Sequence, residues 1–284
     1  MKTYYDCIPC FIRQALDAVR LATADEKIHE SILREILLDA TELDFSQPPP
    51  RMGQAIHRRV RQLSGNSDPY KDVKTKSNQY ALALYPRLVN QVEASAHPME
   101  TAVRLAIAGN IIDFGVSSAV SKTIIDETIA QTLSEPLFGD MDRLLEQAAS
   151  AGTILYIGDN AGEIVFDRLL IERFFCGRVI FSVRGGPIIN DATLADARET
   201  GMNAVAEVID NGSDAPGTIL DDCSEPFLNA FESADLIIAK GQGNYETLSH
   251  VAHRPIVFLL KAKCPVISRH IGCEQGASVI RYAG

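Results

Sequence analysis

Asp159 and Asn160 lie in a short polar turn between an apolar run, residues 153–157, and an amphipathic segment, residues 164–175. The run predicts a buried strand and the segment predicts a helix, so both side chains should lie at the carboxyl end of a strand. Open α/β sheets bind ligands at that edge. Two adjacent side chains that carry oxygen, with glycines before and after them, suit a hard divalent cation. The turn therefore predicts a metal-assisted phosphate site.

Other phosphate-binding motifs demand residues that this turn lacks. A dinucleotide fingerprint would have Gly in place of Asn160, and the charges of Asp159 and Glu163 would repel a pyrophosphate unless a cation intervened. The Gly-Lys-Ser/Thr of a Walker loop is missing, and a haloacid-dehalogenase-type phosphatase would carry Asp in place of Ala161. The simplest alternative is an Asx turn that caps the next helix. Glu163 could orient water or the metal shell, or only favour the helix amino terminus.

Polar clusters also follow three later predicted strands, and right-handed crossovers bring all of these strand ends to one edge of a parallel sheet. With Asp159 and Asn160, Asp191 can supply three oxygen ligands to Mg²⁺ or Mn²⁺ and leave positions for water and a phosphate oxygen. The three clusters are Arg184-Gly185-Gly186-Pro187-Ile188-Ile189-Asn190-Asp191, Asp210-Asn211-Gly212-Ser213 and Lys240-Gly241-Gln242-Gly243-Asn244-Tyr245-Glu246.

Lys240 is the cation that we expect to meet the phosphoryl group. It follows a predicted strand beside Gly241 and Gly243, where backbone amides can bond phosphate oxygens. The alternative is a solvated lysine after a strand.

Asn110 and Asp113 lie three residues apart and share a face if their segment is helical. On that face they could point at the site. The alternative is that they cap a helix end next to Gly115.

Cys7 and Cys10 form a Cys-x-x-Cys pair at the start of a predicted helix, with both sulfurs on one face. Six cysteines in 284 residues are too few for a disulfide scaffold. The pair could be a structural metal site, with Cys264 and Cys273 as further ligands, a redox pair, or inert thiols. Its distance in sequence from the phosphate motifs suggests a structural or regulatory role and no part in the chemical step.

Composition limits the classes of partner. A formal net charge of -10 argues against nucleic acid or an anionic membrane as the main partner, because both require a basic surface. The apolar runs are shorter than a membrane span and the amino terminus is interrupted by charges, so we expect a cytoplasmic protein.

The hydrophobic pattern changes near residue 150. Residues 1–150 predict a helical domain, because apolar residues recur every three or four positions. Residues 151–284 predict a Rossmann-like α/β domain, because apolar strands alternate with helical patterns and so favour a mainly parallel, doubly wound sheet. The predicted strands are residues 153–157, 179–183, 206–209, 236–239 and 256–260.

Several motifs, in their order along both halves of the chain, resemble those of the metal-dependent damage-control phosphatase family. The Cys7-x-x-Cys10 pair resembles the prokaryotic branch of that family. The motifs are Gly109-Asn110-Ile111-Ile112-Asp113, Gly158-Asp159-Asn160-Ala161-Gly162-Glu163, Asn190-Asp191 and Lys240-Gly241-Gln242-Gly243-Asn244-Tyr245-Glu246.

This resemblance implies a three-layer α/β/α sandwich preceded by a helical part. It implies a divalent metal, Mn²⁺, Mg²⁺, Co²⁺ or Ni²⁺, held by Asp159, Asn160 and Asp191, with the phosphate met by Lys240. Asn110 and Asp113 become catalytic candidates. The residues implied to bind substrate or phosphate are Lys240, Gly241, Gly243, Asn244, Gly162, Glu163 and Asn190.

The implied activity is hydrolysis of phosphate monoesters on small metabolites, such as sugar phosphates or damaged cofactor intermediates. The nucleophile is either water or Asp159, because a carboxylate at a strand end can act as ligand or as nucleophile. One competing hypothesis is a carboxyl methyltransferase that uses S-adenosylmethionine, although the first strand lacks the Gly-x-Gly turn for that cofactor. Another is a metal- or redox-sensing binding protein built around Cys7 and Cys10.

Overall fold

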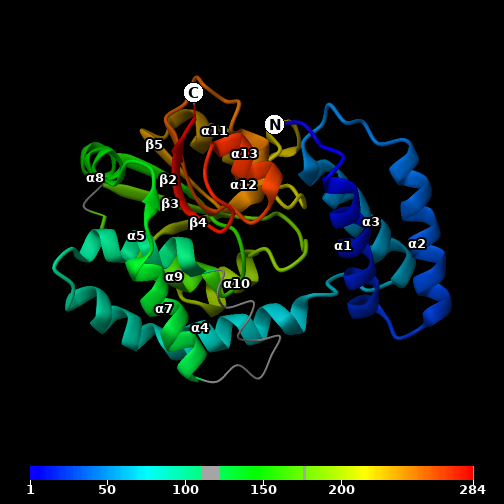
Figure 1. Ribbon diagram of the computed structural model, residues 1–284, viewed down its shortest axis with the longest axis horizontal. Coiled ribbons are helices and arrows are strands. Elements are labelled where there is room, and N and C mark those ends of the chain that lie inside the picture. The colour runs from blue at the N-terminus through cyan, green and yellow to red at the C-terminus, as the bar shows by residue number, and fades with distance from the viewer. Residues whose placement is uncertain (110–121, 175–176, 284) are drawn as a thin grey trace.

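The computed structural model describes residues 1–109, 122–174 and 177–283. Within these ranges a seven-stranded sheet forms the centre of the molecule (Figure 1), in the order β1-β7-β6-β5-β2-β3-β4. All neighbouring strands run parallel except β6 and β7, which pair antiparallel. The strands are β1 (Leu137–Phe138), β2 (Thr153–Ile157), β3 (Arg178–Val183), β4 (Glu207–Asp210), β5 (Leu236–Lys240), β6 (Ile256–Lys261) and β7 (Ser278–Tyr282).

The strand order creates a crevice between β2 and β5. From β2 the chain builds outward through β3 and β4, and it then returns to place β5 and β6 on the other side of β2. Ligands bind at such a reversal in open α/β sheets, outside the carboxyl ends of the strands. The prediction of a mainly parallel, doubly wound sheet is confirmed, and the loops after β2 and β5 flank the crevice.

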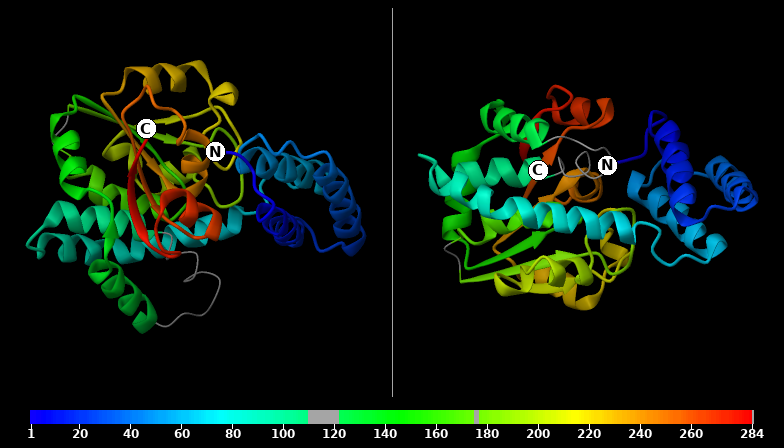
Figure 2. Two further views of the ribbon diagram at one scale, coloured as in Figure 1. Left: turned by 45° about the horizontal axis from the view of Figure 1, so that its top comes forward. Right: turned by 90° about the horizontal axis from the view of Figure 1, so that it is seen from below.

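Helices cover both faces of the sheet, and three more stand beyond one end of it (Figures 1 and 2). No described helix is both long enough and apolar enough to cross a membrane. The described helices are α1 (Cys7–Ala22), α2 (Glu26–Thr41), α3 (Pro49–Ser64), α4 (Lys71–Glu93), α5 (Pro98–Ala108), α7 (Lys122–Ser134), α8 (Met141–Ser150), α9 (Glu163–Ile171), α10 (Leu194–Glu199), α11 (Glu225–Ser233), α12 (Gly241–Leu248) and α13 (Pro265–Ile271).

Alternate residues of each strand pack into different hydrophobic cores, which makes the sandwich three-layered. Ile154 and Tyr156 of β2 pack with α4, α5 and α9 on one face. Leu155 and Ile157 pack with α11, α12 and α13 on the other. A strand buried on both faces reads as a continuous apolar run, which is why the sequence predicted β2 so clearly.

Helices α1, α2 and α3 form a helical cap with a hydrophobic core of its own, which includes Phe11, Ile32 and Ile56. Polar contacts join the cap to the sheet side: Arg58 Nε of α3 donates to Asp214 Oδ1 at 2.9 Å, and Gln54 Nε2 donates to the same oxygen at 2.8 Å. By contrast, α4, α5 and α8 share the core of the sheet. The predicted domain boundary at residue 150 therefore falls inside a continuous core, whereas the cap is separate.

Candidate active site

Two loops at the carboxyl edge of the sheet bring the predicted metal ligands together. Asp159 and Asn160 follow β2, and Asp191 lies in the loop after β3. Backbone hydrogen bonds join the loops: Ala161 N donates to Asn190 O and Ala192 N donates to Asp159 O, each at 2.8 Å. Asn160 and Asp191 form an isolated antiparallel bridge. The strand-end rule therefore correctly predicted that these three residues lie together, and their role as metal ligands stays a prediction.

Arg184 holds the carboxylates of these loops. It follows β3 directly, is 2% exposed, and its Nε donates to Asp191 Oδ2 at 2.7 Å. Its Nη2 lies 3.7 Å from Asp159 Oδ1. Asn160 Nδ2 donates to Asp159 Oδ2 at 3.0 Å and to Glu163 Oε2 at 3.1 Å. Asn160 thus connects the two acidic side chains of its own turn.

The surroundings of Asp159 and Asp191 disfavour the ionised forms of their side chains. Burial raises the pKa of Asp159 well above its ordinary value, and repulsion from Glu163 and Asp191 raises it further, against the attraction of Arg184 and Lys263. Burial also raises the pKa of Asp191, although Arg184 opposes the shift. A bound cation would favour the ionised forms of both carboxylates.

The donor set suits a hard divalent cation. Within residues 1–109, 122–174 and 177–283, no group of three His, Cys, Asp or Glu side chains has the arrangement of a metal site. The amide oxygen of Asn160, beside the carboxylates of Asp159 and Asp191, is of the kind that Mg²⁺ and Mn²⁺ accept. All three side chains face the same cavity.

Lys240 does not face that cavity. Its side chain is fully buried, and Nζ donates to Glu163 Oε1 at 2.6 Å, Asp167 Oδ1 at 2.8 Å and Ala106 O at 2.7 Å. An ammonium group has three donors, and the protein uses all of them. Burial alone would lower the pKa of Lys240, but Asp167 and Glu163 raise it above its ordinary value. In this arrangement Lys240 positions Glu163, and the contact of Lys240 with phosphate stays a prediction.

Gly241 has a structural reason to be glycine. Its φ is +78°, and a Cβ at this position would lie 2.0 Å from Asp159 Oδ2. Only glycine allows the turn after β5 to come this close to the Asp159 carboxylate. Gly243 and Asn190 line the cavity, as a role in substrate binding requires.

Three other predicted phosphate-binding residues lie beneath the cavity wall. Asn244 is fully buried; its Nδ2 donates to Lys240 O at 2.7 Å and its Oδ1 accepts from Arg184 Nη1 at 3.1 Å. Gly162 N donates to Asn78 Oδ1 at 2.7 Å in a buried contact. Glu163 is 2% exposed and paired with Lys240. These polar groups are used by the protein, so the three residues support the site from inside, and a direct contact with phosphate stays a prediction.

Asn110 and Asp113 lie outside the described residues, so their role stays a prediction. The preceding residue, Gly109, is described. A Cβ there would lie 2.7 Å from Glu163 Cγ, so the backbone that leads to Asn110 passes directly beside Glu163.

A cavity of about 380 Å³ opens between the helical cap and the strand ends. Asp159 and Asp191 lie on its sheet side, and Cys7 and Cys10 lie on its cap side. The distance in sequence is therefore not a distance in space, because folding brings the first turn of α1 to the same cavity. That the cysteines take no part in the chemical step stays a prediction. Lys263, in the loop after β6, is the cationic side chain among the described residues that line it.

Sequence reasoning assigned no role to Arg184 or Lys263. Each comes shortly after the end of a strand, β3 and β6 respectively. The strand-end signal that selected Lys240 placed Arg184 in a polar cluster without a role, and it could also have selected Lys263. What it could not show is which of the three cations points into the cavity.

Glu246, on the cavity wall, should make stability depend on pH. Burial raises the pKa of Glu246 to about 7 from an ordinary value of 4.5, although a hydrogen bond from Gln242 and the amino terminus oppose this. As pH rises, Glu246 loses its proton in the unfolded chain before it does so in the folded protein. The contribution of Glu246 to the free energy of unfolding is therefore complete below about pH 4.5 and decreases as pH rises to about 7. Relative to Glu246→Gln, the wild-type free energy of unfolding should drop by about 3 kcal/mol across that range.

Urea unfolding of both proteins at several pH values between 4.5 and 7.5 measures this difference. Glu232→Gln is the control, because that side chain is 59% exposed on α11. Parallel pH curves for wild type and Glu246→Gln would contradict the prediction.

Comparison with known proteins gives consistent results across the chain. The sequence profile of the damage-control phosphatase ARMT1-like domain matches residues 3–279. Damage-control phosphatase PH1575 of Pyrococcus horikoshii is 37% identical, and the alignment covers 98% of this chain and 97% of that protein. A damage-control phosphatase of Archaeoglobus fulgidus is also 37% identical over 99% of both chains. The crystal structure of PH1575, described as a DUF89 family protein, has a TM-score of 0.91 and 34% identity over the whole of both chains.

Proposed function

Because this chain belongs to the damage-control phosphatase family with the ARMT1-like domain and is a phosphatase, we propose that it hydrolyses phosphate monoesters of small metabolites with a divalent cation. One observation carries this proposal. Two carboxylates, the half-buried Asp159 and the buried Asp191, have raised pKa values and face the same cavity as the Lys263 ammonium. Such a site can hold a cation and a phosphoryl group side by side.

Asp159, Asn160 and Asp191 would hold the cation, with Arg184 and Asn160 keeping the carboxylates in place by the hydrogen bonds described above. When bound, Mg²⁺, Mn²⁺, Co²⁺ or Ni²⁺ supplies Lewis-acid polarisation of the phosphoryl oxygens. Glu163 and Lys240 support this arrangement from inside, through Asn160.

Lys263 is the group that we expect to contact the phosphoryl oxygens. Its side chain is exposed and lines the cavity, and its charge acts on Asp159. A lysine ammonium close to a phosphoryl group can offset the charge that develops on the equatorial oxygens. Lys263 thereby takes over the role that the sequence assigned to Lys240.

The cavity matches a small substrate. Its volume of about 380 Å³ lies at the lower end of the range for small-molecule sites. Phe11, Pro49 and Pro50 supply apolar surface on the cap side, and Gln14 supplies an amide. Sugar phosphates and damaged phosphometabolites are the substrate classes that we propose. The phosphoryl group would lie on the sheet side of the cavity, and the organic part of the substrate would face the cap.

Phosphate release tests the proposal directly. The purified protein should be screened against a panel of phosphorylated metabolites with each of the four cations and with chelator. We expect release of phosphate with the cation and none with chelator.

Methyl transfer from S-adenosylmethionine to a protein carboxylate, with no phosphate release from any ester, would support the methyltransferase hypothesis instead. Rapid-quench trapping of a phosphoprotein would identify Asp159 as the nucleophile in place of water.

Lys263→Met should lower kcat/KM by roughly 30- to 1000-fold, because it removes a charge worth about 2 to 4 kcal/mol in the transition state. Cation affinity should change little. Lys261→Met is the matched control: Lys261 ends β6, and its Nζ pairs with Glu135 Oε2 at 3.0 Å. Steady-state kinetics on the best substrate measure both variants. A loss below about threefold in Lys263→Met would show that Lys263 does not contact the phosphoryl group.

A further inference from the structure

Three cysteines from two parts of the fold meet at one cavity. Cys7 and Cys10 come from the first turn of α1 in the helical cap, and Cys264 directly precedes α13 on the sheet side. All three line the cavity that holds Asp159 and Asp191. Each is a free thiol. Cys7 packs against the core of the cap, whereas Cys264 packs against the core between the sheet and α13.

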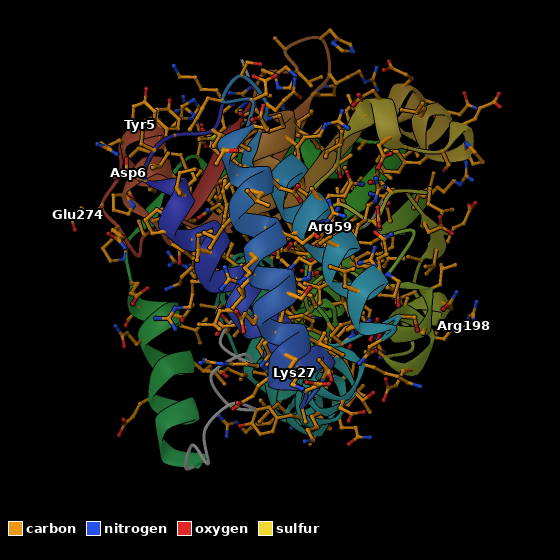
Figure 3. The ribbon with its side chains drawn as sticks, turned by 90° about the vertical axis from the view of Figure 1, so that its right-hand side faces the viewer. Tyr5, Asp6, Lys27, Arg59, Arg198 and Glu274 are labelled. Carbon is orange, nitrogen blue, oxygen red and sulfur yellow. The ribbon has the colours of Figure 1, made fainter. Side chains whose placement is uncertain are left out.

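Polar contacts hold the start of α1 against α13. Arg269 Nη2 of α13 donates to Asp6 Oδ2 at 3.2 Å. The Met1 ammonium donates to the backbone oxygen of Glu246 in α12 at 2.6 Å. Figure 3 shows Tyr5 and Asp6 on the same side of the molecule as Glu274, which follows α13. The start of α1, which carries Cys7, therefore lies beside the segment that begins at Cys264.

The surroundings of Cys7 are consistent with this placement. Burial raises the pKa of the Cys7 thiol, and the neighbouring Glu246, Cys264 and Cys10 raise it further. Cys264 is also in a defined position, because Gln242 Nε2 donates to its Sγ at 3.7 Å. Cys10 is exposed, with its Sγ 4.0 Å from Asp6 O. Of the two cap thiols, the half-buried Cys7 is the one that we select as the partner of Cys264.

We propose that Cys7 and Cys264 form a reversible disulfide that joins the helical cap to the loop after β6 and stops turnover. The oxidant is a small-molecule disulfide. The Cys264 thiolate attacks it and releases one small thiol; the Cys7 thiolate, after losing its proton to solvent, then attacks the mixed disulfide and releases the second. Two electrons pass from the two protein thiols to the oxidant, which is reduced to two thiols.

Closure of the cavity follows from where the bond lies. A disulfide holds its sulfurs about 2.05 Å apart, closer than any contact between unbonded sulfurs. It would draw the cap wall toward Cys264, the residue next to Lys263. The effect on turnover rests on the proposed function, whereas formation of the crosslink does not.

The full-length protein can be equilibrated in mixtures of reduced and oxidised glutathione, and then analysed by mass spectrometry and by phosphatase assay. Trypsin leaves Cys7 and Cys10 in the peptide of residues 3–13 and Cys264 in the peptide of residues 264–269. We expect these peptides to be joined in the oxidised wild type and in Cys10→Ser, and separate in Cys7→Ser and Cys264→Ser. Cys273→Ser, a thiol outside the cavity, should behave like wild type.

Turnover of each variant is compared with its own reduced form. Oxidation should lower kcat/KM at least tenfold in the wild type, Cys10→Ser and Cys273→Ser, with recovery in dithiothreitol. Cys7→Ser and Cys264→Ser should resist this loss. A bond between Cys7 and Cys10, the absence of any crosslink, or inactivation that persists in Cys7→Ser would overturn the proposal, as would a crosslink that leaves turnover unchanged. A crosslinked protein with no activity on any phosphate ester in either redox state would instead count against the proposed phosphatase function.

Discussion

Replacing Asp159 or Asp191 with Asn is expected to abolish binding of the divalent cation and to lower kcat/KM by roughly a thousandfold. Each change keeps the size of the side chain but removes one of the two charged oxygen ligands. The raised pKa values of both carboxylates show that the folded protein alone does not favour their charge. The cation-free Asp159→Asn variant should therefore be at least as stable as the cation-free wild type, because an acidic side chain whose ionised form is disfavoured becomes neutral. Asp191→Asn should be less stable than the wild type, because it removes the charge that pairs with the buried Arg184.

Calorimetric titration with Mn²⁺, urea unfolding without metal, and steady-state kinetics separate these effects. Asp210→Asn is the matched control. Asp210 also ends a strand and precedes an asparagine, but its Oδ1 accepts from Gly212 N at 2.9 Å and it does not line the cavity. If either Asp159→Asn or Asp191→Asn keeps wild-type cation affinity while folded, the proposed ligand is wrong at that position.

Lys240→Met should lower the free energy of unfolding by about 3 to 5 kcal/mol, because it leaves two buried carboxylates without their cation. The side chains of Lys240, Glu163 and Asp167 are 0%, 2% and 0% exposed. Asp167 Oδ2 already has no hydrogen-bond partner. Burial raises the pKa of Asp167 to about 6, even though Lys240 opposes that shift. Without the ammonium, both acids would have to be protonated or solvated.

Urea unfolding at pH 7 measures this loss. Lys261→Met again serves as control: its ion pair is partly exposed and should contribute about 1 kcal/mol or less. Adding Glu163→Gln and Asp167→Asn to Lys240→Met should recover part of the stability, because the uncompensated charges are then absent. A variant with unchanged stability but reduced turnover would restore Lys240 to the phosphate-binding role predicted from the sequence.

The sequence predicted the elements whose physical signal is local. β2, β5 and β6 are buried on both faces, so their apolar runs predict strands. β1 has only two residues, and β7 carries Arg281 near one end. Neither segment has a hydrophobic pattern long enough to predict a strand. Their pairing depends on partners distant in the chain. Asp159, Asn160 and Asp191 could be brought together in advance because parallel strands place their carboxyl ends at one edge.

Whether Lys240 points to the cavity or to the core depends on its position in β5, because a shift by one residue would reverse the direction of its side chain. Leu236 and Ile238 of β5 face the core that contains α5 and α9. Side chains alternate along a strand, so Lys240 continues that series toward α9 and away from the cavity. The sequence shows that Leu236, Ile238 and Lys240 lie on the same face of β5. Only the structure shows that this face is the one covered by α5 and α9. The approach of Cys7 to Cys264 is different in kind, because no local pattern encodes a contact across most of the chain.

The strand order also has a consequence during synthesis. β7 lies between β1 and β6, although it is the last of the described strands to leave the ribosome. Until it inserts, the backbone groups of β6 on that side have no strand partner, and unpaired edges of this kind associate with other chains. A folding intermediate in which β7 has not yet inserted is therefore more prone to aggregation than the folded protein, and a chaperone that shields the β6 edge would raise the yield of folded protein.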